Sequence, residues 1–280
     1  MRVVQLILCI TSFCVAQDVQ IFQCDYLGEH PPGDTPKIFG QGTISTDLDE
    51  YNFELSPDGK TMVFARSGNI ILVERAKETG GWGKPYIASF SSSFVEGEPC
   101  FLPLGTEILF SSQRPLGNSS HSSIIWTSKF EHNNWSVPEP LTGLLSLKKM
   151  HAISVSLAGN IYDTGIIRFL KTEVGSYSST PFEIQGVKGS HPYISPDESF
   201  IIYASRKRGS YNKDLFIAYR TSLNSWTEPI GVGEAINSTR NETSPFVTPD
   251  GQYLFFGRDY NVYWVSAAFI EKLKPIAPGR

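Results

Sequence analysis

Six polar residues have the chemistry of a ligand or metal site and recur at a similar place in successive segments of the chain. Each lies just before an apolar run that we expect to form a strand: Glu50, Asn52, Glu98, His151, His191 and Glu242. Imidazole and carboxylate are good zinc ligands, so the two histidines could hold a metal with Glu98 and Glu242. These residues lack a tight local spacing such as His-x-x-x-His, so only a ring-like fold would bring them together. The same side chains could instead bind another ligand, or simply solvate a channel.

Four arginines form a second repeated set, each near the end of a predicted second strand: Arg66, Arg114, Arg206 and Arg258. They could pair with glutamates of the neighbouring repeat, an interaction worth about 0–1 kcal/mol at a surface. They could also grip an anionic ligand in a bidentate way. We favour the structural pairing and keep these arginines, with Asn52, Glu98, His151, His191 and Glu242, as the candidate ligand-binding set.

Motifs of common enzymes do not occur in the sequence. It contains no Gly-x-Ser-x-Gly, no His-Glu-x-x-His, no glycine-rich phosphate loop and no metal-type cysteine pair. We therefore expect no cofactor, no bound metal and no catalytic residue. The alternative is a glycosidase-like enzyme in which Glu98 and Glu242 act as acid and base.

The elements that position these residues follow from a repeated turn. Ser-Pro-Asp-Gly at 56–59 returns as Ser-Pro-Asp-Glu at 195–198 and Thr-Pro-Asp-Gly at 248–251, with weaker copies at 103–105 and 156–159. Proline presets the turn, and Asp and Gly tolerate the conformations that follow, so each copy predicts a hairpin. A hairpin about every 40 to 54 residues indicates a repeat architecture.

Each repeat contains four predicted strands, the third rich in β-branched and aromatic residues and the fourth opening with Trp and Pro. Five units begin near residues 49, 96, 149, 189 and 242. The third is degenerate and the fifth lacks its outer strand, which residues 35–46 could supply by closing a ring. A short helical piece is expected at 267–273.

These turns, the Asp214-Leu215-Phe216 type of strand and the Trp-x-x-Pro outer strands resemble the WD40-like β-propeller repeat of TolB-type envelope proteins over about residues 35–266. The resemblance implies an all-β propeller of five four-stranded blades, with six as the alternative. It implies little about activity, because such repeats occur in scaffolds, in adaptors and beside peptidases. We expect a lead-in at 18–34 and one propeller domain at 35–280.

The N-terminus predicts export. Arg2 precedes an apolar stretch at 3–15 and small residues near Ala16, typical of a signal peptide at 1–17 and shorter than the roughly 18 residues of a membrane span. Cys24 and Cys100 would remain, as a disulfide or as free thiols. The net charge of −4 argues against nucleic-acid binding.

The sequence therefore predicts a non-catalytic periplasmic or secreted propeller, monomeric and without a transmembrane span. We expect it to serve as a scaffold of the cell envelope that binds a protein or glycan partner.

Overall fold

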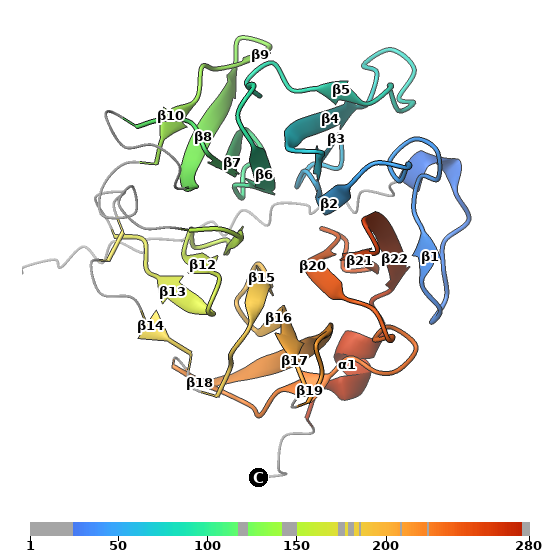
Figure 1. The fold of residues 1–280 in the computed structure, drawn as a ribbon, viewed down its shortest axis with the longest axis vertical. Coiled ribbons are helices and arrows are strands. Elements are labelled where there is room, and N and C mark those ends of the chain that lie inside the picture. The colour runs from blue at the N-terminus through green and yellow to red at the C-terminus, as the bar shows by residue number, and fades with distance from the viewer. Residues whose placement is uncertain are drawn as a thin grey trace, which may run out of the picture.

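The computed structural model describes residues 25–116, 123–141, 150–172, 177–178, 182–184, 186–207, 209–222 and 224–275. Five antiparallel sheets surround a central axis (Figure 1). This arrangement confirms the predicted five-bladed β-propeller and excludes the six-bladed alternative. The predicted signal peptide and Cys24 lie outside the described residues.

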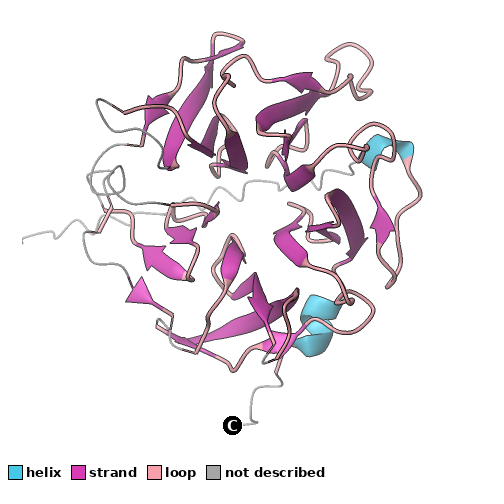
Figure 2. Ribbon diagram, in the orientation of Figure 1, coloured by secondary structure: helices cyan, strands magenta, loops and turns pink. Residues whose placement is uncertain are grey.

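Within each blade three strands follow one another in chain order outward from the axis, and one or two short strands pair with the third (Figure 2). Blade 1 contains β2 (Glu50–Leu55), β3 (Thr61–Arg66), β4 (Asn69–Glu74) and β5 (Tyr86–Ile87). Blade 2 contains β6 (Glu96–Phe101), β7 (Glu107–Ser112), β8 (Ile124–Glu131), β9 (Asn134–Trp135) and β10 (Glu139–Pro140). Blade 3 contains β11 (Ile153–Val155), β12 (Ile161–Asp163), β13 (Ile167–Phe169) and β14 (Phe182–Glu183).

The remaining two blades complete the ring. Blade 4 contains β15 (Ser190–Ile194), β16 (Phe200–Arg206), β17 (Lys213–Ser222), β18 (Ser225–Trp226) and β19 (Ile230–Gly231). Blade 5 contains β20 (Glu242–Val247), β21 (Tyr253–Arg258), β22 (Asn261–Ser266) and β1 (Lys37–Ile38). A 3₁₀ turn at Tyr26–Gly28 precedes β1, and the helix α1 (Phe269–Leu273) follows β22.

The predicted turns join the first two strands of the blades. In blade 1 the Ser56 hydroxyl donates to Asp58 at 2.6 Å and accepts the amide of Thr61 at 2.9 Å, so the side chain closes the turn. Gly59 has φ +69°, the left-handed region that glycine favours. The Ser195 and Thr248 turns repeat this hydroxyl–aspartate contact. The repeated motif is therefore a set of local hydrogen bonds that start each hairpin.

The N-terminal strand closes the ring as predicted. β1 pairs antiparallel with β22, with Lys37 opposite Trp264 and Ile38 opposite Tyr263. The next residue, Phe39, is fully buried. Its ring lies 5.0 Å from Phe255 of blade 5 and 5.4 Å from Phe53 of blade 1, in edge-to-face contacts. The segment thus joins the last blade to the first, and both sides of the ring share one core.

The core lies between neighbouring blades. Val63 and Leu72 of blade 1, for example, belong to the same buried cluster as Phe110 and Trp126 of blade 2. Such packing of sheet on sheet gives each blade two apolar faces and explains why the third strands carry almost continuous apolar runs. Among the described residues, no helix has the length and apolarity needed to cross a membrane.

Candidate functional site at the channel mouth

A repeated irregularity in the inner strands places polar side chains at the axis. In β2, β6, β15 and β20 the pairing with the second strand shifts at one corresponding position, as in a β-bulge. The residues there have positive φ between 50° and 54°, although none is a glycine: Asn52, Glu98, His191 and Ser244. Non-glycine residues in this region carry about 1–3 kcal/mol of strain each, and such strain concentrates at functional sites.

Three candidate residues from different blades converge near the bulges. One carboxylate oxygen of Glu98, Oε1, lies 3.6 Å from His151 Nδ1 and 3.6 Å from His191 Nε2. The two imidazole rings are 5.9 Å apart and nearly perpendicular. Glu98 is only 2% exposed, whereas the His151 side chain is 62% exposed. The cluster therefore extends from a buried carboxylate to a histidine that faces solvent.

Ser190 and Lys213 form hydrogen-bonding contacts next to this cluster. Lys213 Nζ donates to Ser190 Oγ at 3.0 Å, and the same hydroxyl lies 3.0 Å from His191 Nδ1. Burial lowers the pKa of Lys213, the charge of Arg206 lowers it further, and Glu98 opposes both effects. Ser190 and Lys213 could not be predicted from the sequence as part of the site, because only the register of blade 4 brings them beside a histidine.

Beside the cluster is a polar cavity of about 340 Å³. His191 lines it together with Asp49, Asn241, Thr243 and Tyr260. Burial raises the pKa of Asp49, with a smaller contribution from Glu50. Tyr260 is 70% exposed, and sequence alone could not distinguish this tyrosine from a core residue. The cavity thus combines carboxylate, amide and hydroxyl groups with an accessible aromatic side chain.

Glu242 and three of the candidate arginines belong to buried ion pairs rather than to the cluster of Glu98 and the histidines. Arg258 Nε donates to Glu242 Oε1 at 2.8 Å, and the Ser238 hydroxyl donates to the same carboxylate. Blades 1 and 2 repeat this arrangement as Arg66–Glu50 with Thr46 and as Arg114–Glu96 with Ser92. The pairs form within a blade rather than between blades, because each Glu begins the inner strand and each Arg ends or follows the second strand beside it. We call this contact the hydroxyl–Glu–Arg clamp.

Arg206 has no clamp. Ser190 pairs with Ala204 as Tyr51 pairs with Ala65, so Gly189 stands in blade 4 where Glu50 stands in blade 1. A Cβ on Gly189 would lie 2.4 Å from the carbonyl oxygen of Ala204, which leaves no room for a glutamate. By the same register Ser205 stands where Arg66 stands in blade 1, and Arg206, one residue further on, is exposed.

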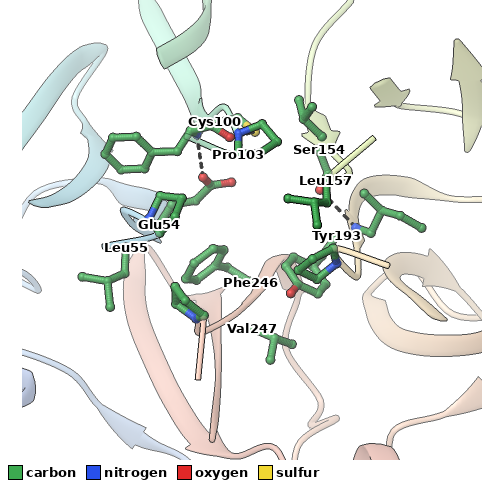
Figure 3. Close-up of a pocket in the computed structure, with 15 residues that line it drawn as sticks. Glu54, Leu55, Cys100, Pro103, Ser154, Leu157, Tyr193, Phe246 and Val247 are labelled. Carbon is green, nitrogen blue, oxygen red and sulfur yellow. Dashed lines mark hydrogen bonds between the residues drawn. The ribbon is translucent and has the colours of Figure 1, made fainter. Parts of the chain in front are cut away.

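The opposite end of the channel is apolar (Figure 3). A cavity of about 190 Å³ is lined there by residues of the turns in all five blades: Pro57, Pro103, Leu157, Pro196 and Pro249. Glu54 and Cys100 face this cavity, and Glu54 accepts the amide of Phe101 at 2.8 Å. Burial raises the pKa of Glu54 to about 8 and, with the charge of Glu54, raises that of the buried free thiol of Cys100.

The architecture follows from the five sheets that surround one axis and from the N-terminal strand β1 that closes the ring. The chain folds as a five-bladed β-propeller. No family model matches it, and no curated protein matches it either. Solved structures that are similar to this propeller include one from Agrobacterium tumefaciens designated as a TolB, with 15% identity over 76% of this chain and 71% of that chain, and a TM-score of 0.47.

Two further similar structures come from proteins of different kinds. The Swd1 β-propeller domain of Myceliophteria thermophila has 11% identity over 76% of this propeller and 69% of that chain, with a TM-score of 0.41. A gluconolactonase from Xanthomonas campestris has 12% identity over 85% of this propeller and 97% of that chain, with a TM-score of 0.45. At these identities the similarity concerns the fold alone, so the function must be argued from the site.

Proposed function

We propose that this protein is a non-catalytic binding propeller that takes a glycan at its polar channel mouth, outside the cytoplasm. The observation that carries the proposal is the cavity of about 340 Å³ beside His191. Ligand sites are concave and combine a few placed polar groups with aromatic surface. Asp49, Asn241 and Thr243 offer acceptors and donors for sugar hydroxyls, and the exposed face of Tyr260 offers a surface for a pyranose ring.

The shape of the mouth favours a glycan over a protein partner. A stable protein interface buries about 800 Å² on each side and usually has an apolar centre. Carboxylate, amide and hydroxyl side chains line the hollow at the mouth, among them Asp49, Asn241 and Thr243. The export of the protein, which the proposal also requires, is supported by the signal-like sequence at 1–17.

Catalysis by a pair of axial carboxylates receives less support. Glu242 is fully buried, is clamped by Arg258 and Ser238, and does not line the cavity. A general acid or base must reach the proton that it transfers. Glu242 in its clamp is not free to do so, and Glu98 alone does not make a glycosidase pair.

The test is a binding screen of the purified protein against oligosaccharides from bacterial envelopes, followed by calorimetric titration of the best ligand. Tyr260→Ala should weaken binding roughly 3- to 10-fold, the effect of losing one aromatic contact. Tyr86→Ala, which removes a partly exposed tyrosine on the outer strand β5, is the matched control and should leave affinity unchanged. Failure of the wild-type protein to bind any glycan, or equal effects of the two variants, would refute the proposal.

A further inference from the structure

We propose that Glu98, His151 and His191 form a binding site for a divalent metal ion of the zinc class. The inference goes beyond glycan binding, because the three residues can hold a metal whether or not the cavity beside them takes a sugar. Candidate ligand atoms of these residues all lie within 4.8 Å of one another. Each residue comes from a different blade, so the site exists only in the closed ring.

The distances fit a metal better than they fit hydrogen bonds. Glu98 Oε1 is 3.6 Å from a nitrogen of each histidine, beyond the 2.7–3.2 Å usual for a hydrogen bond. In a tetrahedral zinc site with bonds of about 2.0–2.1 Å, neighbouring ligand atoms lie about 3.3 Å apart. Small side-chain rotations, for which the exposed His151 has room, would bring all three ligands to that spacing.

The second oxygen of Glu98 is an independent indication that this site binds a cation. Glu98 Oε2 is buried and has no hydrogen-bond partner among the residues that the structure describes. Glu98 as a whole is 2% exposed. A buried carboxylate without compensating partners is unfavourable, and metal coordination is one of the two usual ways in which proteins compensate such a charge. A cation between Glu98 and the histidines would supply that compensation.

The surroundings of His191 also match a metal ligand. Metal-binding histidines usually donate their second ring N–H to a nearby oxygen, which orients the ring. Ser190 Oγ lies 3.0 Å from His191 Nδ1 and accepts from Lys213 on its other side. When His191 Nδ1–H donates to Ser190, the lone pair of Nε2 faces Glu98 and is free to bind the ion.

The donor set indicates which ions fit. Two imidazoles and one carboxylate suit zinc and its transition-metal neighbours, whereas calcium and magnesium prefer all-oxygen sites. Three protein ligands leave a fourth position for water or for an oxygen atom of a ligand. His191 lines the polar cavity, so that position is accessible from the channel mouth.

The decisive experiment titrates ZnCl₂ into chelator-treated full-length protein by calorimetry, with metal content measured by mass spectrometry and with Co²⁺ absorption as a probe of ligand geometry. One equivalent of zinc should bind. Glu98→Gln and His191→Gln should each weaken binding by more than about 100-fold, and Ser190→Ala by about 10- to 100-fold. His30→Gln, which alters an exposed histidine elsewhere, is the matched control and should bind like the wild type.

Circular dichroism of each variant ensures that a lost signal does not reflect misfolding. If a variant misfolds, the site is tested instead by the Co²⁺ spectrum of the wild type, which should show tetrahedral nitrogen and oxygen ligation. A wild-type protein that binds neither Zn²⁺ nor Co²⁺ would overturn the inference, as would equal affinities of Glu98→Gln and His30→Gln. Either result leaves the glycan screen unaffected, so the two proposals can fail separately.

Discussion

The hydroxyl–Glu–Arg clamp predicts a sharp difference between two arginines that look alike in the sequence. Arg258 pairs with the fully buried Glu242, whereas Arg206 is exposed in a blade that has Gly189 at the glutamate position. We expect Arg258→Met to destabilise the protein strongly and Arg206→Met to have almost no effect.

The magnitude follows from what remains after the substitution. Removing one partner of a buried ion pair costs about 3–5 kcal/mol, because the other charge stays buried. The Arg258 side chain is still 14% exposed, and Ser238 keeps its hydrogen bonds to Glu242, so we expect the lower end, about 3 kcal/mol. In a protein of this size that corresponds to a fall in Tm of about 6–12 °C. Arg206→Met should stay within about 0.5 kcal/mol.

Urea-induced unfolding and calorimetry of the two variants measure this difference. The double variant Arg258→Met/Glu242→Met is the internal control, since replacing both partners by apolar groups is often neutral and should recover most of the lost stability. The reasoning is refuted if Arg258→Met loses less than about 1 kcal/mol, or if Arg206→Met loses as much.

Three other predictions follow from the described contacts. Phe39→Ala should cost about 3–5 kcal/mol in unfolding free energy, because it opens a cavity where the last blade meets the first, while Lys37→Ala, two residues earlier in β1, should cost almost nothing; equal losses would contradict the role of Phe39. Burial raises the pKa of Glu54 to about 8 from 4.5, so the folded protein keeps a proton that the unfolded chain releases. The free energy of unfolding should therefore fall between about pH 4.5 and 8, by at most about 1.4 kcal/mol per pH unit. Glu54→Gln should remove this contribution to the pH dependence of stability, which urea titrations of both proteins at each pH would measure. Glu98→Gln should stabilise the chelator-treated protein by about 1 kcal/mol or more, because it neutralises a buried carboxylate whose second oxygen has no hydrogen-bond partner among the described residues, and thermal melts that show a loss instead would contradict this account.

Much of the fold could be predicted because its signals are local. The turn at 56–59 closes through Ser56, Asp58 and Gly59, all within four residues, and its copies carry the same chemistry. The outer strand that the last repeat lacks could also be predicted from the sequence. Residues near Ile38 have the proline and apolar pattern of an outer strand, and in the structure they pair with the C-terminal blade. The sequence could not decide between five and six blades, because the third repeat is degenerate. Its strands at 153–155 and 161–163 are short and have only weak apolar patterns, so they could be recognised only from their packing in the structure.

The candidate site was predictable only in part. The repeat pattern singled out Glu98, His151 and His191, which the structure brings together, although Glu98 and His191 lie inside the inner strands rather than before them. The same reasoning grouped Glu242 with them, although Glu242 belongs to a clamp. In an inner strand the glutamate of the clamp lies only two residues before the bulge position that lines the axis. The sequence does not indicate where the bulge occurs.

The sequence by itself determined the hairpins, the repeat and the strand that closes it, because turn chemistry and alternating apolar runs act between residues that are neighbours in the chain. Only the tertiary structure decided which polar residues meet. A residue at the bulge, such as Glu98, lines the axis. The residue two positions before it, Glu96, instead pairs with an arginine of its own blade. That choice depends on the register of strand pairing and on the closure of five blades around one axis, neither of which is a local property.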